Sequence, residues 1–448
     1  MNMKEIEPQK SENNLEFKLY GARWITISIF ALLAAVNAIQ WLEYSIITNI
    51  IMKYYGVSSV AVDGTSMIAM ATYPVLLFPA TYVIDKIGLR YAVLLGGLGT
   101  TVGAWIKIFS VQPHLFWVGY VGQTVVFTSQ PFILGLPPKI AAVWFGPNEM
   151  STACCIGIFG SQLGTALSFI LPPLIVENHD NLDDIGRELL YLFYSIAIFS
   201  SVTLFLIFVL FKSEPPSPPS KAQADLKSNR TESFNKIFLK SYKSLSTNKS
   251  FLLHAISFGI NLGVYVTVCT LLNQFVLEYF EDAETDAGLT GLFLVVVGMG
   301  GVVIFGIVLD KTRKYKETAI ALYGTTILSI IAFLVALEMY SKILLYIAGC
   351  LLGFFQTGYY GVGFEFGVEL SYAQPESTSS GILVAMVQAF GIIFTLLLGQ
   401  LLPYFGTFWA LVSIIAVLTL GGIITITIPN KLRRQEALSS RDELSIEN

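Results

Sequence analysis

Charged residues are scarce in this 448-residue chain, because Asp, Glu, Lys and Arg together make up 13% of it. Soluble domains carry about twice that share. Hydrophobic residues make up 54%, and the mean hydropathy is +0.66. This composition excludes a soluble globular protein. Apolar runs of about 20 residues recur along the whole length and predict an all-α, polytopic membrane protein embedded in a lipid bilayer.

Cysteine and histidine are also rare, with four Cys and three His in the whole chain. All four cysteines fall inside apolar segments, and the neighbours Cys154 and Cys155 do not pair readily. The sequence shows no metal-ligand spacing, no catalytic triad and no nucleotide-binding loop in or beside the apolar runs. We therefore expect a protein that is not an enzyme, with no cofactor, no metal and no nucleic-acid partner.

The apolar runs predict twelve membrane-spanning helices in two groups of six. The expected spans are roughly 24–51, 64–84, 91–111, 116–143, 152–176, 188–211, 251–277, 287–309, 318–338, 343–370, 378–401 and 405–429. The segment between the groups is rich in Pro, Ser and Lys, which is typical of a solvated linker. The expected layout is an N-terminal tail (1–23), an N-terminal half (24–211), a linker (212–250), a C-terminal half (251–429) and a C-terminal tail (430–448).

Lysine and arginine are distributed unevenly between the two sides of the membrane that these spans define. Nearly all of them lie in the two tails, the linker and the loops after even-numbered spans, whereas the opposite side holds only Lys53, Arg187 and Lys342. Lys107 lies within the third span. Because basic loops stay on the cytosolic side, both termini are expected in the cytosol.

A repeat of about 225 positions relates the two groups of helices. Asp85-Lys86 follows the second span and Asp310-Lys311 follows the eighth, while similar Pro-Glu-Ser-Thr-type segments precede the fifth and eleventh spans. Two parallel six-helix halves with such a repeat are the layout of the major facilitator superfamily, and residues 85–90 resemble its loop motif between helices two and three. The residues expected to act in conformational gating are Asp85, Lys86, Arg90, Asp310, Lys311 and Glu376.

Polar and aromatic residues inside the spans obey the same offset. Trp41 corresponds to Tyr265, Gln130 to Gln356 and Gln162 to Gln388, each near the middle of its span. In the superfamily layout these positions converge at the midplane between the halves, where such transporters bind substrate. The predicted substrate-binding residues are therefore Trp41, Tyr265, Gln130, Gln388, Gln162 and Gln356.

The chemistry of this set favours a cation with a hydroxyl group. Aromatic faces attract a desolvated quaternary ammonium, and glutamine amides can bind a hydroxyl without adding charge. A strongly anionic substrate would require more basic residues inside the spans than Lys107. The alternatives are that the glutamines hold helices together and that the aromatic residues only pack.

Glu43 is a carboxylate inside the first span, two residues after Trp41. A buried carboxylate in a membrane helix is a candidate proton relay. It is equally a candidate fixed partner for a polar helix, and both roles stay open at this point.

Several blocks resemble the feline leukemia virus subgroup C receptor-related (FLVCR) family. They are NAIQWLEYSIITN (37–49), QPFILGLP (130–137), AVWFGP (142–147), STAC (151–154) and QLG (162–164). The resemblance covers all twelve spans. It implies facilitated transport of choline and ethanolamine across the plasma membrane, by a monomer that works by alternating access.

The resemblance also implies roles for individual residues. Trp41 and Tyr265 resemble the aromatic pair around the ammonium, and Gln130 and Gln388 resemble the polar contacts to the substrate. Ser161 stands where the family pattern has Asn before Gln-Leu-Gly. Haem transport, in either direction, is the alternative function from the same family, and a non-transporting receptor or sensor with the same fold is the second alternative.

Overall fold

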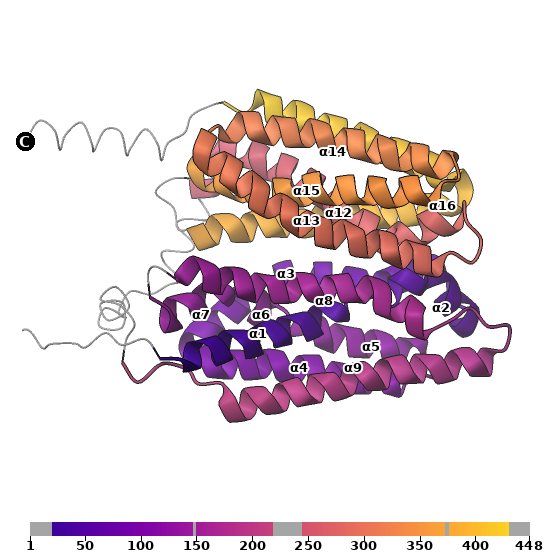
Figure 1. The fold of residues 1–448 in the computed structure, drawn as a ribbon, viewed down its shortest axis with the longest axis horizontal. Helices are drawn as coiled ribbons and strands as arrows, with labels where there is room; N and C mark the ends of the chain where they lie inside the picture. The colour runs from indigo at the N-terminus through magenta and orange to yellow at the C-terminus, as the bar shows by residue number, and fades with distance from the viewer. Residues whose placement is uncertain (1–19, 147–148, 218–243, 372–375, 430–448) are drawn as a thin grey trace, which may run out of the picture.

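A computed structural model describes residues 20–146, 149–217, 244–371 and 376–429. Its helices form two bundles, one from α1–α9 and one from α12–α16 (Figure 1). The predicted C-terminal tail, most of the predicted linker and the predicted N-terminal tail up to residue 19 lie outside the described residues.

The N-terminal bundle contains the first six spans. It consists of α1 (Ala22–Ile39), η1 (Ser45–Ile47), α2 (Thr48–Tyr55), α3 (Ser59–Ile87), α4 (Leu89–Ile108), α5 (Phe116–Thr128), α6 (Pro131–Leu134), α7 (Pro137–Trp144), α8 (Met150–Ile175) and α9 (Leu182–Leu210). Both span one and span four are broken; the prolines of span four predict an interruption there, whereas no such signal marks span one. Span one is interrupted at residues 40–44, and span four is divided into α5, α6 and α7, where Pro131 and Pro137 cannot donate a helical hydrogen bond.

The C-terminal bundle contains the other six spans. It consists of α12 (Lys249–Leu277), α13 (Glu284–Thr312), α14 (Tyr315–Glu338), α15 (Lys342–Leu370) and α16 (Glu376–Thr427). Gly406 breaks α16 into two helices with φ 75° and ψ 172°. Within the described residues, ten helices are long and apolar enough to cross a membrane. Span four, whose three short helices are not among these ten, adds one span, and the division of α16 into two helices adds another. The number of spans is therefore the predicted twelve.

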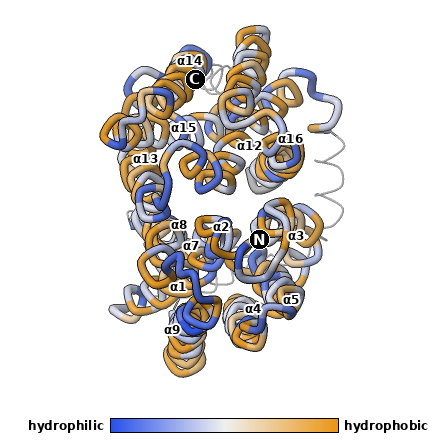
Figure 2. Tube along the Cα trace, turned by 90° about the vertical axis from the view of Figure 1, so that its right-hand side faces the viewer, coloured by the Kyte–Doolittle hydropathy of each residue, from blue (hydrophilic) through white to orange (hydrophobic). Residues whose placement is uncertain are grey.

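The two bundles are built alike, which the repeat predicted. Span one packs on span five in the first bundle, and span seven packs on span eleven in the second. Small residues allow the close approach: a Cβ at Gly164 of α8 would lie 2.2 Å from the backbone oxygen of Ala35 of α1. Seen end-on, the bundles meet along α3 with α16 and along α8 with α13 (Figure 2).

The molecule has two ends, the α2 end and the terminal end. The α2 end carries α2 and the loops 109–115, 176–181 and 278–283. The terminal end is the opposite one, where α1 begins at Ala22 and α16 ends at Thr427 (Figure 1).

Candidate functional site

The break in span one is the centre of the candidate site. Helix α1 ends at Ile39, and the chain passes through turns at residues 40–44 before η1 begins. Polar residues that would be costly against lipid are turned inward here. The Asn37 amide, for example, is buried and donates a 3.0 Å hydrogen bond to the Thr100 hydroxyl of α4.

Trp41 lies in this non-helical segment, with its ring half-buried. It packs against a small hydrophobic cluster between α3 and α5 that consists of Ile68, Ala69, Val126 and Phe127. Its indole Nε1 is buried and has no hydrogen-bond partner among the described residues. An unpaired buried donor is unusual, because it loses its hydrogen bond to water without replacement. The Trp41 ring therefore offers both an aromatic face and a free N–H.

Gln130 lies at the second break, between α5 and α6, three residues after Phe127 of the cluster against which Trp41 packs. Its side chain is half-buried, and its Oε1 is buried without a partner among the described residues. Trp41 and Gln130 thus add a donor and an acceptor to the buried polar atoms of the N-terminal half that have no partner among the described residues. Such a pair matches a hydroxyl, which both donates and accepts.

In the C-terminal half, Tyr265 of α12 and Gln388 of α16 are both half-buried. The Tyr265 hydroxyl lies beside Thr357 of α15 and Cys269. Gln388 has no hydrogen bond to another described residue. Trp41 and Tyr265 pack against one continuous hydrophobic cluster that spans both halves, and Met70 of α3 approaches Gly391 of α16 within it.

The other two predicted glutamines differ in their surroundings. Gln356 of α15 is fully buried and donates a 2.7 Å hydrogen bond to the backbone oxygen of Asn261, so it joins α15 to α12. Its Oε1 has no partner among the described residues. Gln162 of α8 is half-buried and has no hydrogen bond to another described residue.

Of the predicted gating residues, three have described side chains. Lys86 is exposed, with its ammonium 5.9 Å from the centre of the Tyr82 ring. Arg90 donates a 3.0 Å hydrogen bond to the backbone oxygen of Phe208, joining α4 to α9. Lys311 is exposed in the last turn of α13. The side chains of Asp85, Asp310 and Glu376 lie outside the described part of the structure.

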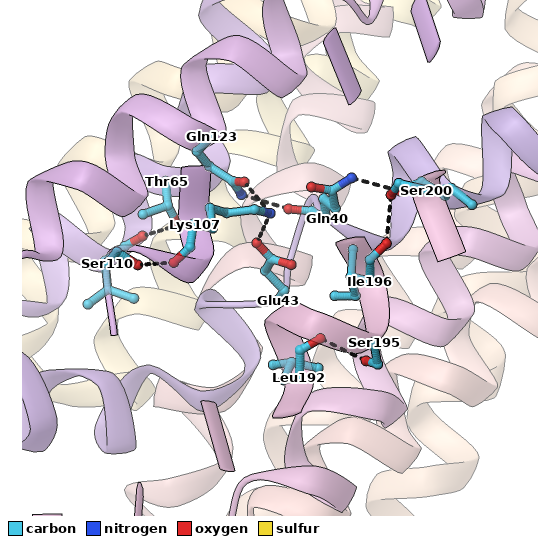
Figure 3. Close-up of polar contacts among 12 residues, drawn as sticks. Gln40, Glu43, Thr65, Lys107, Ser110, Gln123, Leu192, Ser195, Ile196 and Ser200 are labelled. Carbon is cyan, nitrogen blue, oxygen red and sulfur yellow. Dashed lines mark hydrogen bonds and ion pairs between the residues drawn. The ribbon is translucent and has the colours of Figure 1, made fainter. Parts of the chain in front are cut away.

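Glu43 is 1% exposed and forms an ion pair with Lys107 of α4, whose side chain is equally buried. Figure 3 shows this pair beside Gln123 of α5 and Gln40. The pair carries no net charge, so the carboxylate next to the Trp41 segment is not a free anion for a cationic ligand. This pairing could not be predicted from the sequence, because 64 positions separate the two residues.

Polar contacts between the halves form a group that sequence reasoning missed. Hydrogen bonds between described residues of different halves all lie toward the α2 end, and they join α12 and α13 to η1, α2 and α3. The donor–acceptor distances are 2.6 Å for Asn49–Glu284, 2.8 Å for Gln274–Asp63, 3.2 Å for Ser66–Thr270, 2.8 Å for Asn273–Ile46 O and 3.4 Å for Asn273–Asn49. The α2 end is therefore closed by direct contact between the halves.

One signal in the sequence could have identified this group. Asn49 and Asn273 are 224 positions apart, the same offset that relates Trp41 to Tyr265. Corresponding residues of the two halves thus form a hydrogen bond with each other.

An apolar groove between α4 and α9 contains none of the predicted site residues. Its walls include Tyr91, Leu95, Leu98, Phe205 and Phe208, all of which are exposed on the outer surface of the bundle. Such a surface suits contact with lipid chains and lacks the polar groups of a substrate site. Among the described residues, no group of three or more His, Cys, Asp or Glu could hold a metal ion.

Comparison with known proteins identifies relatives over nearly the whole chain. The Major Facilitator Superfamily model matches residues 29–369. The choline/ethanolamine transporter FLVCR2 of Homo sapiens is 40% identical over 420 residues, which cover 94% of this chain and 80% of that protein. The choline/ethanolamine transporter flvcr2a of Danio rerio is 41% identical over 432 residues, which cover 95% and 92% of the two chains.

An uncharacterized MFS-type transporter of Caenorhabditis elegans is 44% identical over 430 residues, covering 96% of this chain and 73% of that protein. Among solved structures, a bacterial homolog of the human lysosomal transporter Spinster, inward-facing and unoccupied, has a TM-score of 0.72 at 12% identity. It covers 93% of this chain and 99% of that one, and it supports the fold. The chain is a transporter and not an enzyme, and it belongs to the Major Facilitator Superfamily and, within it, to the FLVCR family that its sequence motifs predicted.

Proposed function

We propose that the protein is a facilitative transporter that moves choline and ethanolamine across the plasma membrane by alternating access. The observation that carries the proposal is the 40–41% identity, over more than nine-tenths of this chain, to relatives named choline/ethanolamine transporters. The substrate is a small molecule, and a monomer is sufficient because both halves of the site lie in one chain.

The ammonium group is bound by aromatic faces in this proposal. Trp41 supplies one face from the break in span one, and Tyr265 supplies another from α12. The neutral ion pair at Glu43 leaves no free carboxylate there, so cation–π attraction is the main electrostatic interaction available to the substrate. The unpaired Trp41 Nε1 and Gln130 Oε1 support binding of the choline hydroxyl, with Gln388, Gln162 and Gln356 as further polar contacts.

The proposed orientation in the membrane assigns the contacts between the halves to one side of the bilayer. The positive-inside distribution places both termini, and thus the terminal end, in the cytosol. The closed α2 end then faces outward. Asp85, Lys86, Arg90, Asp310, Lys311 and Glu376 lie at the terminal end, where we propose that they stabilise the opposite, outward-open state.

Haem transport, the alternative from the same family, gains no support from the histidines. His254 is fully buried, and its Nε2 already bonds the backbone oxygen of Gly363 at 2.7 Å. His179 lies in the loop between α8 and α9, where its 2.7 Å hydrogen bond to Glu188 raises its pKa. A raised pKa favours the imidazolium, which cannot ligate iron. A non-transporting receptor would bind choline without flux, which the following test distinguishes.

The test is uptake of radiolabelled choline by cells that express the intact chain, compared with Trp41→Ala and Tyr265→Ala. Each substitution removes one face of the aromatic cage, and we expect saturable uptake to be lost while the surface level of the protein stays unchanged. Trp117→Ala is the matched control, because Trp117 of α5 is 62% exposed on the outer surface. It should transport as the natural chain does.

Normal uptake by both cage variants would overturn the aromatic cage. Choline binding to the natural chain without any flux would favour the receptor, and absence of both binding and flux would overturn choline as the substrate.

A further inference from the structure

Four polar side chains are buried together between the break in span one and helices α4 and α5. Gln40, Glu43, Lys107 and Gln123 have exposed fractions of 0–1%. The proposed substrate contacts do not include any of them. Buried polar groups at membrane depth are costly unless they are fully paired, so a cluster of four calls for an explanation.

The cluster is a continuous chain of contacts (Figure 3). The Lys107 ammonium pairs with the Glu43 carboxylate and donates to Gln123 Oε1 at 3.2 Å. Gln123 Nε2 in turn donates to the backbone oxygen of Gln40 at 2.6 Å. The Lys107 side chain reaches this point by running along Gly122, where a Cβ would lie 2.6 Å from its Cγ. Helices α4 and α5 are thus both tied to the segment 40–44.

These contacts to the segment 40–44 supply hydrogen-bond partners that the break in span one removes. A helix that stops at Ile39 leaves backbone carbonyl groups without their partners four residues ahead, and the membrane interior supplies no water to replace them. Gln123 donates a hydrogen bond to the backbone carbonyl of Gln40, and Lys107 pairs with the carboxylate of Glu43 three residues later. Trp41 lies between Gln40 and Glu43, so the contacts of these two residues determine the position of its ring.

We propose that Lys107 and Gln123 are positioning residues for the substrate site, which hold the broken segment 40–44 so that the Trp41 ring faces the ammonium group. This inference rests on the proposed function for its effect on transport. The effect on the Trp41 ring itself is independent of what the protein transports. Neither residue touches the substrate.

The test uses Gln123→Met, which keeps the volume of the side chain but removes both of its hydrogen bonds. The purified full chain is labelled with 5-fluorotryptophan, and the Trp41 signal is identified among the six tryptophans by its absence in Trp41→Phe. We expect Gln123→Met to shift or broaden the ¹⁹F signal of Trp41 and to leave that of Trp117 unchanged. The KM for choline should rise by about tenfold with little change in the maximal rate per transporter, as when one cation–π contact is lost.

The matched control is Gln112→Met, the same substitution at an exposed position between α4 and α5. It should change neither the fluorine spectrum nor the KM. If Gln123→Met does not fold, Gln123→Asn takes its place, because its amide is one methylene too short to reach the Gln40 oxygen. An unchanged Trp41 signal together with an unchanged KM would overturn the inference. Absence of choline uptake in the natural chain would instead overturn the proposed function, and the Trp41 signal would still decide the positioning role.

Discussion

At the scale of single residues, the buried ion pair shows how this protein tolerates charge at membrane depth. An isolated ionised group costs several kcal/mol after burial, and a close partner repays that cost only when the geometry is good. Glu43 and Lys107 meet this condition in part: Lys107 also bonds Gln123, whereas Oε2 of Glu43 has no partner among the described residues. The sequence left Glu43 open between a proton relay and a fixed partner, and the contact with Lys107 supports the fixed partner.

The ion pair predicts different stabilities for single and double substitutions. Lys107→Met leaves the Glu43 carboxylate buried and unpaired, and should lower the free energy of unfolding by about 3–5 kcal/mol. Glu43→Gln combined with Lys107→Met removes both charges, and the double variant should lose much less free energy of unfolding than Lys107→Met alone. The measurement is thermal unfolding of the purified protein followed by tryptophan fluorescence. Equal losses in the two variants would show that the charges are not coupled.

At the scale of helices, much of the architecture could be predicted from the sequence. Twelve spans and two equivalent halves follow from apolar length and from the repeat. Pro131 and Pro137 mark the break in span four, but the break at residues 40–44 could not be placed, because a run of apolar residues shows that a segment crosses the membrane but not that its backbone stays helical. The same limit applies to the site. The repeat predicts Trp41 and Tyr265 as a pair, but it gives no information about contacts such as Lys107 with Glu43.

The division of α16 shows a break with a local cause. Gly406 has φ 75° and ψ 172°, a conformation essentially restricted to glycine, and the second helix begins directly after it. The Glu278 carboxylate accepts hydrogen bonds from the Thr407 backbone N–H at 2.8 Å and from its hydroxyl at 2.6 Å. Glu278 thus caps the new helix.

Gly406→Ala should therefore destabilise the protein by about 1–3 kcal/mol, because the backbone conformation is unfavourable for alanine. The added Cβ would also lie 2.7 Å from Glu278 Oε1. Gly300→Ala is the control, since Gly300 lies inside α13 with nothing within 4 Å of its would-be Cβ. Melting temperatures of the two variants give the comparison, and a Gly406→Ala protein as stable as Gly300→Ala would contradict the strain at this hinge.

At the scale of the whole molecule, the contacts at the α2 end select one conformation. Asn273 alone bonds both the Ile46 backbone oxygen and the Asn49 side chain of the other half. Each such hydrogen bond contributes about 0.5–1.5 kcal/mol. An equilibrium between two conformations of similar free energy is sensitive to changes of this size.

Asn273→Ala should therefore shift the population away from the state closed at the α2 end, by about 1–3 kcal/mol for the two bonds. Spin labels on cysteines at Lys212 and Lys249 would report the change as a new, shorter distance, because these exposed residues follow α9 of one bundle and begin α12 of the other near the terminal end. The four native cysteines are first replaced by serine or alanine. Asn178→Ala is the control, since its bond to Lys53 stays within one half. An unchanged distance distribution in Asn273→Ala would rule out this role.

The hydrogen bond between Asn49 and Asn273 has a consequence for how the molecule could have arisen. Parallel halves of this superfamily are related by a twofold axis along the membrane normal, and a residue close to such an axis meets its own copy. In a symmetric dimer of identical six-helix subunits, one asparagine would have supplied both sides of this bond. Duplication and fusion of the ancestral gene would then have retained this hydrogen bond between the two halves of the single chain without any new substitution.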